Sequence, residues 1–199
     1  MFIFIELSVM KKLLLVCLSY FLFSAVLLAQ TTPKSITPAK KTTGATAMEQ
    51  DTIPPYKKDP HIPRFSILLA DSSSFTKAQL PKYDYTAIIY FSPDCGHCQY
   101  TTKEIVRHMD SLKNVFFVFV AYKSVAIIKE FVEAYGLNQF PNIRVGHDPL
   151  YYVPSFFRVS YTPYVAIYDK SGSLLKVYDP PNRPVMEVSE LIELVNPKK

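Results

Sequence analysis

Residues 86–99, TAIIYFSPDCGHCQ, decide the fold, because an apolar run leads directly into two closely spaced cysteines. The run at 86–91 predicts a buried strand in a sheet that is covered on both faces. After Cys95, apolar and small side chains recur every three or four positions, which predicts a helix that begins near this cysteine. The members of that helical face are Cys98, Thr102, Ile105, Met109 and Leu112. The two cysteines are therefore expected where a strand passes into a helix.

The chain from residue 61 onward continues this alternation of strands and helices. Four further strands are expected, over residues 65–69, 115–121, 164–168 and 174–178. Two further helices are expected, over residues 124–135 and 185–195. Ser124 is a suitable N-cap for the first of these helices, and Gly136 is suited to end it. The order of elements predicts an α/β domain with a central mixed β-sheet flanked by helices on both faces.

Length and composition limit what the chain can be. Its 199 residues are enough for one domain of ordinary size with additional segments. A hydrophobic content of 49% and a charged content of 20% allow a packed core. The net charge of +5 comes without any run of more than two basic residues, so no nucleic-acid partner is expected. No phosphate-binding glycine motif occurs among the five glycines, and no cofactor is expected.

The first 29 residues predict an export segment. The run at 13–29, LLLVCLSYFLFSAVLLA, carries no charge and follows Lys11 and Lys12, which is typical of a secretory signal peptide. Its 17 residues also reach the lower limit for crossing a bilayer, so an uncleaved N-terminal membrane anchor is the alternative. Either form would place the rest of the chain in the periplasm or at the outer face of a membrane.

Residues 30–60 predict a flexible linker. They are rich in Thr, Pro and Lys and contain few large apolar side chains, so they cannot bury enough surface to offset the entropy lost on ordering. The segment is either a tether or a remnant of processing. The expected organisation is thus 1–29 for export, 30–60 as linker and 61–199 as the folded domain.

Cys95 and Cys98 are the only cysteines that remain once residues 1–29 are removed. The N-terminus of a helix carries partial positive charge, which lowers the pKa of a thiol placed there, and Cys95 gains most from this position. Cys98 lies one turn further on, close enough to form a small disulfide loop with Cys95. His97 lies between them and, when protonated, adds positive charge beside the Cys95 sulfur. The pair is therefore a candidate for redox chemistry.

Other roles for the pair fit the spacing less well. A structural disulfide over so short a loop removes little entropy from the unfolded chain. A zinc site needs two more ligands, and neither His61 nor His147 has ligand-like spacing to the cysteines. A c-type haem needs a histidine directly after Cys98, where Gln99 stands.

Two motifs carry a family resemblance. FSPDCGHCQ at 91–99 resembles the active site of the thioredoxin superfamily, and YTPYVAIYDKSG at 161–172 resembles its Thr-Pro strand and the turn that follows. The export segment makes the chain look most like the TlpA-like (ResA-like) membrane-associated branch. The resemblance covers roughly residues 61–195 and implies a thioredoxin-like fold.

The resemblance also implies roles for individual residues. Cys95 would be the nucleophile, Cys98 the resolving cysteine that forms a disulfide with it, and His97 a group that tunes the thiolate. Pro163 would be a cis-proline packed against the disulfide, and the backbone of Thr162 would pair with an extended substrate segment. From the residues alone, Pro163 could equally be a trans residue that starts an edge strand.

The function expected from this resemblance is thiol–disulfide exchange with cysteine-containing protein substrates. Net reduction would require an electron donor in the membrane. Two positions depart from the thioredoxin pattern, because Ile89 replaces a buried aspartate and Asp94 replaces an aromatic residue before the first cysteine. Glu104, on the same helix as the cysteines, is expected to be solvated. The negative charge of Asp94 would oppose the thiolate.

Two alternative functions stay open. A peroxiredoxin-like peroxidase would need a proline seven residues before the nucleophile, where Ile88 stands, although Ser92 meets the second condition of that pattern. A copper chaperone would use Cys95, Cys98 and His147 as ligands. The aromatic-rich segment 135–159 is either part of a groove for a partner or core followed by a loop.

Overall fold

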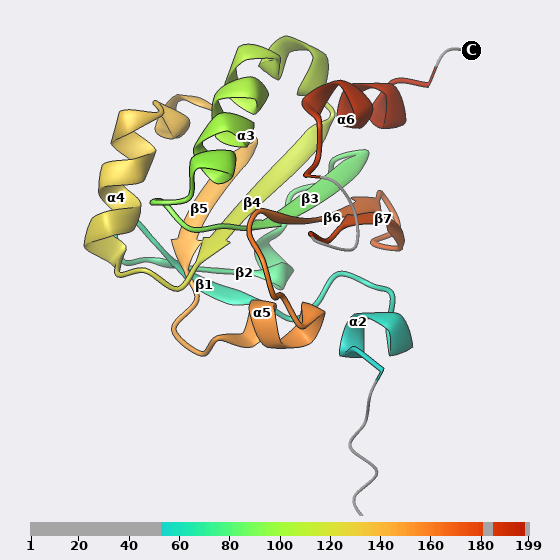
Figure 1. The fold of residues 1–199 in the computed structure, drawn as a ribbon, viewed down its shortest axis with the longest axis horizontal. Coiled ribbons are helices and arrows are strands. Elements are labelled where there is room, and N and C mark those ends of the chain that lie inside the picture. The colour runs from blue at the N-terminus through green and yellow to red at the C-terminus, as the bar shows by residue number, and fades with distance from the viewer. Residues whose placement is uncertain (1–52, 181–184, 198–199) are drawn as a thin grey trace, which may run out of the picture. The chain divides into compact units, whose positions relative to one another are not determined.

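The computed structural model describes residues 53–180 and 185–197. Its elements, shown in Figure 1, are helix α2 (Pro55–Lys58), strands β1 (Ser66–Leu69), β2 (Ser74–Thr76) and β3 (Tyr85–Tyr90), helix α3 (Gly96–Arg107), strand β4 (Val115–Ala121), helix α4 (Val125–Ala134), strand β5 (Ile143–His147), helix α5 (Tyr152–Phe157), strands β6 (Tyr164–Asp169) and β7 (Leu174–Tyr178), and helix α6 (Val188–Val195). Short 3-10 turns cover Lys77–Gln79, Met109–Leu112 and Leu137–Gln139. The expected export segment 1–29 and residues 30–52 of the expected linker lie outside the described residues.

The strands form one mixed sheet in the order β2-β1-β5-β4-β3-β6-β7. Strands β3, β4 and β5 run parallel to one another, whereas β6 and β7 continue the sheet antiparallel beyond β3. On the other side, β1 pairs antiparallel with both β5 and β2. The carboxyl ends of three central strands therefore lie at one edge of the sheet, and α3 begins just beyond that edge.

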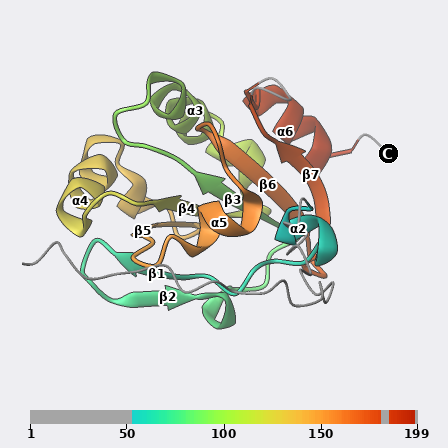
Figure 2. The same cartoon turned by 60° about the horizontal axis from the view of Figure 1, so that its bottom comes forward.

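Helices cover both faces of the sheet, as the sequence predicts (Figures 1 and 2). One face, with Ile89 and Phe119, packs under α3, α4 and α6. The other face, with Ile88 and Val118, packs against α5. Every residue of β4 is buried, so this strand contributes apolar side chains to both halves of the core. Each fully buried side chain of this kind stabilises the fold by about 1.5–3 kcal/mol.

Most of the expected elements are present with shifts of a few residues at their ends. β4 and β7 have the expected bounds, and α6 begins at Val188 rather than at residue 185. The face of α3 is buried as expected, but the α-helix ends at Arg107, and Met109 and Leu112 lie in a 3-10 turn. Ser124 occupies the N-cap position of α4 without a side-chain capping hydrogen bond. Gly136 follows α4 with a φ of 61°, a conformation that favours glycine.

Four elements were not expected from the sequence, namely α2, β2, β5 and α5. Two of them lie in the aromatic-rich segment 135–159, which contributes Val153 and Phe157 to the core and leaves Leu150 and Tyr151 exposed. The segment is thus core with a surface loop. Helix α2 occupies part of residues 53–60, the described end of the expected linker, and its Tyr56 ring lies 5.7 Å from that of Phe157.

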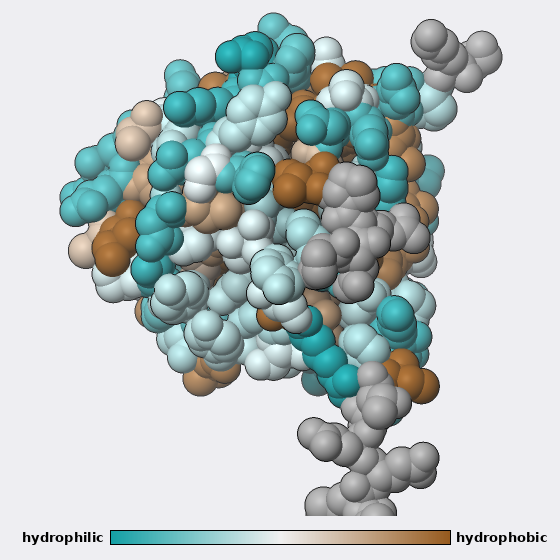
Figure 3. All heavy atoms as spheres, in the orientation of Figure 1, coloured by the Kyte–Doolittle hydropathy of each residue, from teal (hydrophilic) through white to brown (hydrophobic). Residues whose placement is uncertain are grey.

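The surface of the described residues is mixed in polarity. In the view of Figure 3, hydrophobic residues are interspersed with hydrophilic ones. Within the described ranges, none of the helices has the length and apolar character needed to cross a membrane.

The contact between β5 and β1 allows a test of the packing. A methyl group on Gly146 would lie 2.9 Å from the Leu68 carbonyl oxygen and 2.8 Å from Ile67 Cδ1, so Gly146→Ala has to push the two strands apart. We expect this substitution to lower the free energy of unfolding by about 1–3 kcal/mol in urea titrations. Gly96→Ala is the matched control, because its methyl group meets nothing within 4 Å. Equal effects of the two substitutions would contradict the packing argument.

Candidate active site at the start of α3

The two cysteines lie where strand β3 passes into helix α3. The backbone N–H of Cys95 donates to the carbonyl of Ser92 at 3.0 Å, which closes a tight turn with Pro93 at its second position. Cys95 is the N-cap residue of α3, with extended backbone angles of −86° and 118°. The turn thus ends at the point where the unpaired N–H groups of the helix begin, as the sequence predicts.

The Cys95 sulfur is surrounded by backbone groups from two parts of the chain. The N–H of Cys98 donates to Cys95 Sγ at 3.4 Å. Across the site, Cys95 Sγ lies 3.5 Å from the carbonyl oxygen of Thr162, to which the thiol donates. Cys95 is partly exposed, whereas Cys98 is only 2% exposed, and both are free thiols in this structure. One sulfur is therefore open to a partner molecule and the other is covered.

These surroundings move the pKa values of the two thiols in opposite directions. Burial raises the pKa of Cys95, but hydrogen bonds from the side chains of Cys98 and Thr162 and from the backbone N–H groups of Cys98 and His97 outweigh it, so the pKa lies below 9.0. Burial, together with the hydrogen bond to Cys95, raises the pKa of Cys98 to about 12. When the pair loses a proton, the negative charge therefore resides on Cys95, while Cys98 stays protonated.

His97 is exposed, and its backbone contributes to lowering the Cys95 pKa. Its ring forms no hydrogen bond within the described ranges. A role of this ring in tuning the thiolate stays a prediction.

Thr162 and Pro163 reach the site from the segment before β6. The peptide bond between them is cis, in agreement with the resemblance, and Pro163 is buried. The Thr162 carbonyl faces the Cys95 sulfur, so part of the backbone that the resemblance assigns to substrate pairing lies beside the open thiol.

The structure also shows the surroundings of Ile89 and Glu104. Ile89 is fully buried in the core below α3, so this position supplies no internal base. Glu104 is not solvated as expected, because its side chain is only 14% exposed and pairs with Arg107 at 2.5 Å and with His108 at 3.8 Å. Arg107 thus compensates the charge of Glu104.

Sequence reasoning missed Lys123. Its Nζ lies 3.1 Å from Oδ2 of Asp94, although the two residues are 29 positions apart and belong to different loops. Only the parallel pairing of β3 with β4 brings these loops together, so no local signal could have revealed the contact.

The histidines considered as metal ligands lie apart from the cysteines. His61 is exposed and bonds to Asp59 at 2.8 Å. His147 ends β5, with Nδ1 buried and without a hydrogen bond. Across residues 53–180 and 185–197, no three His, Cys, Asp or Glu side chains gather closely enough to hold a metal ion.

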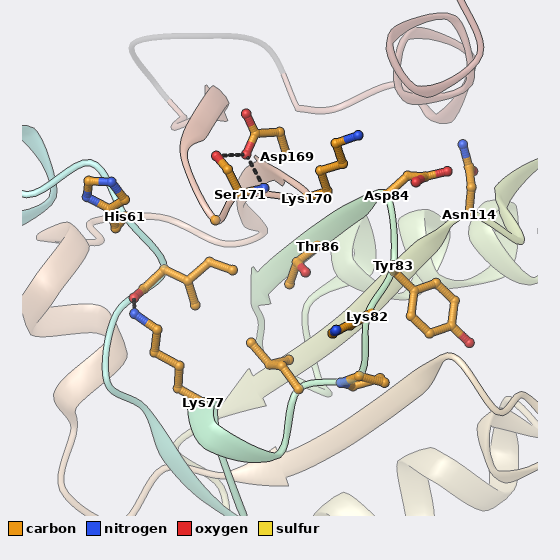
Figure 4. A pocket seen from close by; sticks show the side chains of 14 residues that line it. His61, Lys77, Lys82, Tyr83, Asp84, Thr86, Asn114, Asp169, Lys170 and Ser171 are labelled. Carbon is orange, nitrogen blue, oxygen red and sulfur yellow. Dashed lines mark hydrogen bonds between the residues drawn. The ribbon is translucent and has the colours of Figure 1, made fainter.

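Figure 4 shows a pocket of about 760 Å³, and neither cysteine is among the residues that line it. Its lining includes Tyr83, Asp84 and Thr86, at the start of β3, whereas Cys95 follows the end of that strand. Lys77, which also lines it, donates to the carbonyl of Ile62. The pocket is therefore not part of the cysteine site.

The different acidities of the thiols predict selective alkylation. At pH 7.5, iodoacetamide should modify Cys95 at least about tenfold faster than Cys98. Only a thiolate reacts, and the Cys98 thiol is covered and has a raised pKa. The Cys95 rate should rise with pH and level off with a midpoint below 9.0. Peptide mass spectrometry distinguishes the two sites. In denaturant the difference should disappear, and faster modification of Cys98 in the folded chain would contradict the geometry.

Comparison with known proteins supports the fold. No protein-family model matches the chain, and no curated protein matches it by sequence. Among solved structures, a secreted Mycobacterium tuberculosis disulfide oxidoreductase, described as homologous to E. coli DsbE, aligns with a TM-score of 0.55 and 20% identity over 66% of this chain and 94% of that one. The dsbF protein of the same organism, solved in mixed oxidised and reduced forms, gives 0.55 and 26% over 66% and 92%.

A peroxiredoxin-like protein from Aquifex aeolicus aligns with a TM-score of 0.56 and 20% identity over 68% of this chain and 83% of that one. Likeness at this level of identity establishes architecture rather than activity. The chain therefore has a thioredoxin-like fold, in which Cys95 and Cys98 lie close together as a CXXC-type pair.

Proposed function

We propose that this protein is an exported thiol–disulfide oxidoreductase that exchanges disulfides with cysteine-containing proteins. The observation that carries the proposal is the asymmetry of the cysteine pair at the start of α3. Cys95 is partly exposed and has a lowered pKa, whereas Cys98 is covered and has a raised pKa. A nucleophile and a resolving thiol need these two environments.

The proposed reaction proceeds in two exchange steps. The Cys95 thiolate attacks one sulfur of a substrate disulfide, forming a mixed disulfide and releasing the first substrate thiolate. Cys98 then gives up its proton and attacks the Cys95 sulfur, which releases the second substrate sulfur. The substrate gains two electrons and two protons overall, and the Cys95–Cys98 disulfide is formed. The reverse sequence oxidises a substrate dithiol.

The environment of Cys95 also bears on the direction of exchange. Hydrogen bonds that stabilise the thiolate favour the reduced form of the pair, which makes its disulfide a stronger oxidant. Sustained reduction of substrates would need an electron donor, which we propose to be a membrane protein. Export, and a membrane tether as its alternative form, rest on the sequence of residues 1–60.

The alternative functions gain less support from the site. The hydroxyl of Ser92, the one residue that meets the peroxidase pattern, donates to Asp94, and Ile88 is buried in β3. For a copper chaperone, no third ligand side chain joins the two cysteines within the described residues. Peroxide consumption and copper titration of the reduced protein are the direct tests of these alternatives.

The redox role predicts a reversible two-electron transition. In graded glutathione buffers, thiol-alkylation mass shifts should show Cys95 and Cys98 oxidised together and reduced together. A pair that stays oxidised at every ratio of glutathione to its disulfide would instead be a structural bridge, and the proposal would fail.

The assignment of roles predicts which variant accumulates a mixed disulfide. Cys98→Ser should trap a covalent complex with a peptide disulfide, because the resolving thiol is missing. Cys95→Ser is the matched control and should trap at least about tenfold less, because its remaining thiol is covered and protonated. Intact mass spectrometry measures both, and greater trapping by Cys95→Ser would reverse the roles.

A further inference from the structure

An acidic side chain stands directly before the proposed nucleophile. The turn that ends at Cys95 leaves the side chain of Asp94 70% exposed. A carboxylate beside a thiol opposes the thiolate, because like charges repel each other. Hydrogen bonds from Ser92 and Lys123 hold the pKa of Asp94 below its ordinary value, so this carboxylate is charged at neutral pH. Its charge must be compensated if Cys95 is to react as a thiolate.

Lys123 supplies the opposite charge from the loop between β4 and α4. Its Nζ lies 3.1 Å from Asp94 Oδ2, and its side chain is only 24% exposed. The same ammonium lies 5.1 Å from the centre of the Tyr122 ring, which in turn packs 5.9 Å from the ring of Tyr151. An aromatic ring thus also contacts the lysine ammonium. The ion pair ties the turn before Cys95 to the loop after β4.

We propose that Lys123 is a positioning residue of the disulfide-exchange site, whose ion pair with Asp94 neutralises the charge beside Cys95 and so favours the reactive thiolate. Lys123 stays protonated throughout, and the proton that Cys95 loses goes to solvent. The inference rests on the proposed function for its biological meaning. The ionisation of Cys95, in contrast, can be measured without any disulfide substrate.

Other groups near Cys95 also influence the ionisation of its thiol. On α3 they are Cys98, whose N–H bonds to the Cys95 sulfur, and the exposed His97. The segment before β6 presents the uncharged carbonyl of Thr162. In the β4–α4 loop, Lys123 pairs with Asp94 and lies over the ring of Tyr122. His97 and Cys98 are the same in every variant below, so they do not distinguish one variant from another.

The sign of the effect follows from electrostatics. Lys123→Gln leaves the Asp94 carboxylate uncompensated, which disfavours the thiolate and moves the midpoint of Cys95 alkylation to higher pH. Asp94→Asn removes the negative charge and moves the midpoint to lower pH. For charges exposed to solvent, each change should alter the alkylation rate at pH 6.5 by about threefold. The pair should also become more reducing in Lys123→Gln, because its reduced form is less favoured.

The test is the pH profile of Cys95 alkylation by iodoacetamide in the reduced full chain, read by peptide mass spectrometry. Lys123→Arg should restore the wild-type midpoint, because it keeps the positive charge. Lys129→Gln is the matched control, since it removes a lysine from α4 that pairs only loosely with Glu133, at 4.0 Å. Its profile should coincide with that of the wild type.

The shape of the profile separates a charge effect from a structural one. A loosened loop would change the rate at every pH, including the plateau, whereas a charge effect moves the midpoint and leaves the plateau unchanged. An unmoved midpoint in Lys123→Gln, or an equal shift in Lys123→Arg or Lys129→Gln, would overturn the inference. If the wild-type chain failed to exchange disulfides but the midpoint still moved, the proposed function alone would be wrong.

Discussion

The hydrogen bond from the Cys98 N–H to the Cys95 sulfur is the interaction on which the site depends. It exists because Cys95 is the N-cap of α3, a position where a side chain normally satisfies an unpaired N–H group of the first turn. A thiolate accepts such a bond more strongly than a thiol does, so the capping geometry itself favours ionisation. The cap and the proposed nucleophile are thus the same atom, and the local folding of α3 bears directly on the acidity of this sulfur.

The sheet determines what else can reach this sulfur. Because β3 and β4 run parallel, the segments that follow them start at the same edge of the sheet. This brings Lys123 next to Asp94. Because β6 runs antiparallel to β3, the residues before β6 arrive at that same edge and place Thr162 opposite Cys95. A mixed sheet of this order therefore gathers one loop from each neighbouring strand around the helix terminus.

Features that depend on neighbouring residues could be predicted from the sequence, whereas features that depend on contacts between distant parts of the chain could not. The buried strands and the helix at Cys95 come from local apolar patterns, and the sequence predicts them correctly. Strand β5 contains Arg144 and Gly146, so its pattern is weak, and only its place beside β4 reveals it. Glu104 was expected to be solvated, but the next turn of the chain places Arg107 and His108 against its side chain, which is only 14% exposed. Lys123 depends on strand pairing across 29 residues, which no local pattern encodes.

The buried Ile89 beneath the pair bears most on the second step of the proposed exchange. Cys98 is covered and its pKa is raised, so it must lose a proton before it can attack a mixed disulfide. Ile89 cannot accept that proton, and Glu104 is engaged by Arg107 and lies 3.8 Å from His108. Formation of the mixed disulfide removes the negative charge from Cys95, and with it one of the causes that raise the Cys98 pKa. In the proposed exchange, the first step would therefore prepare the second, and the proton would leave to water or to the departing substrate thiolate rather than to Ile89 or Glu104.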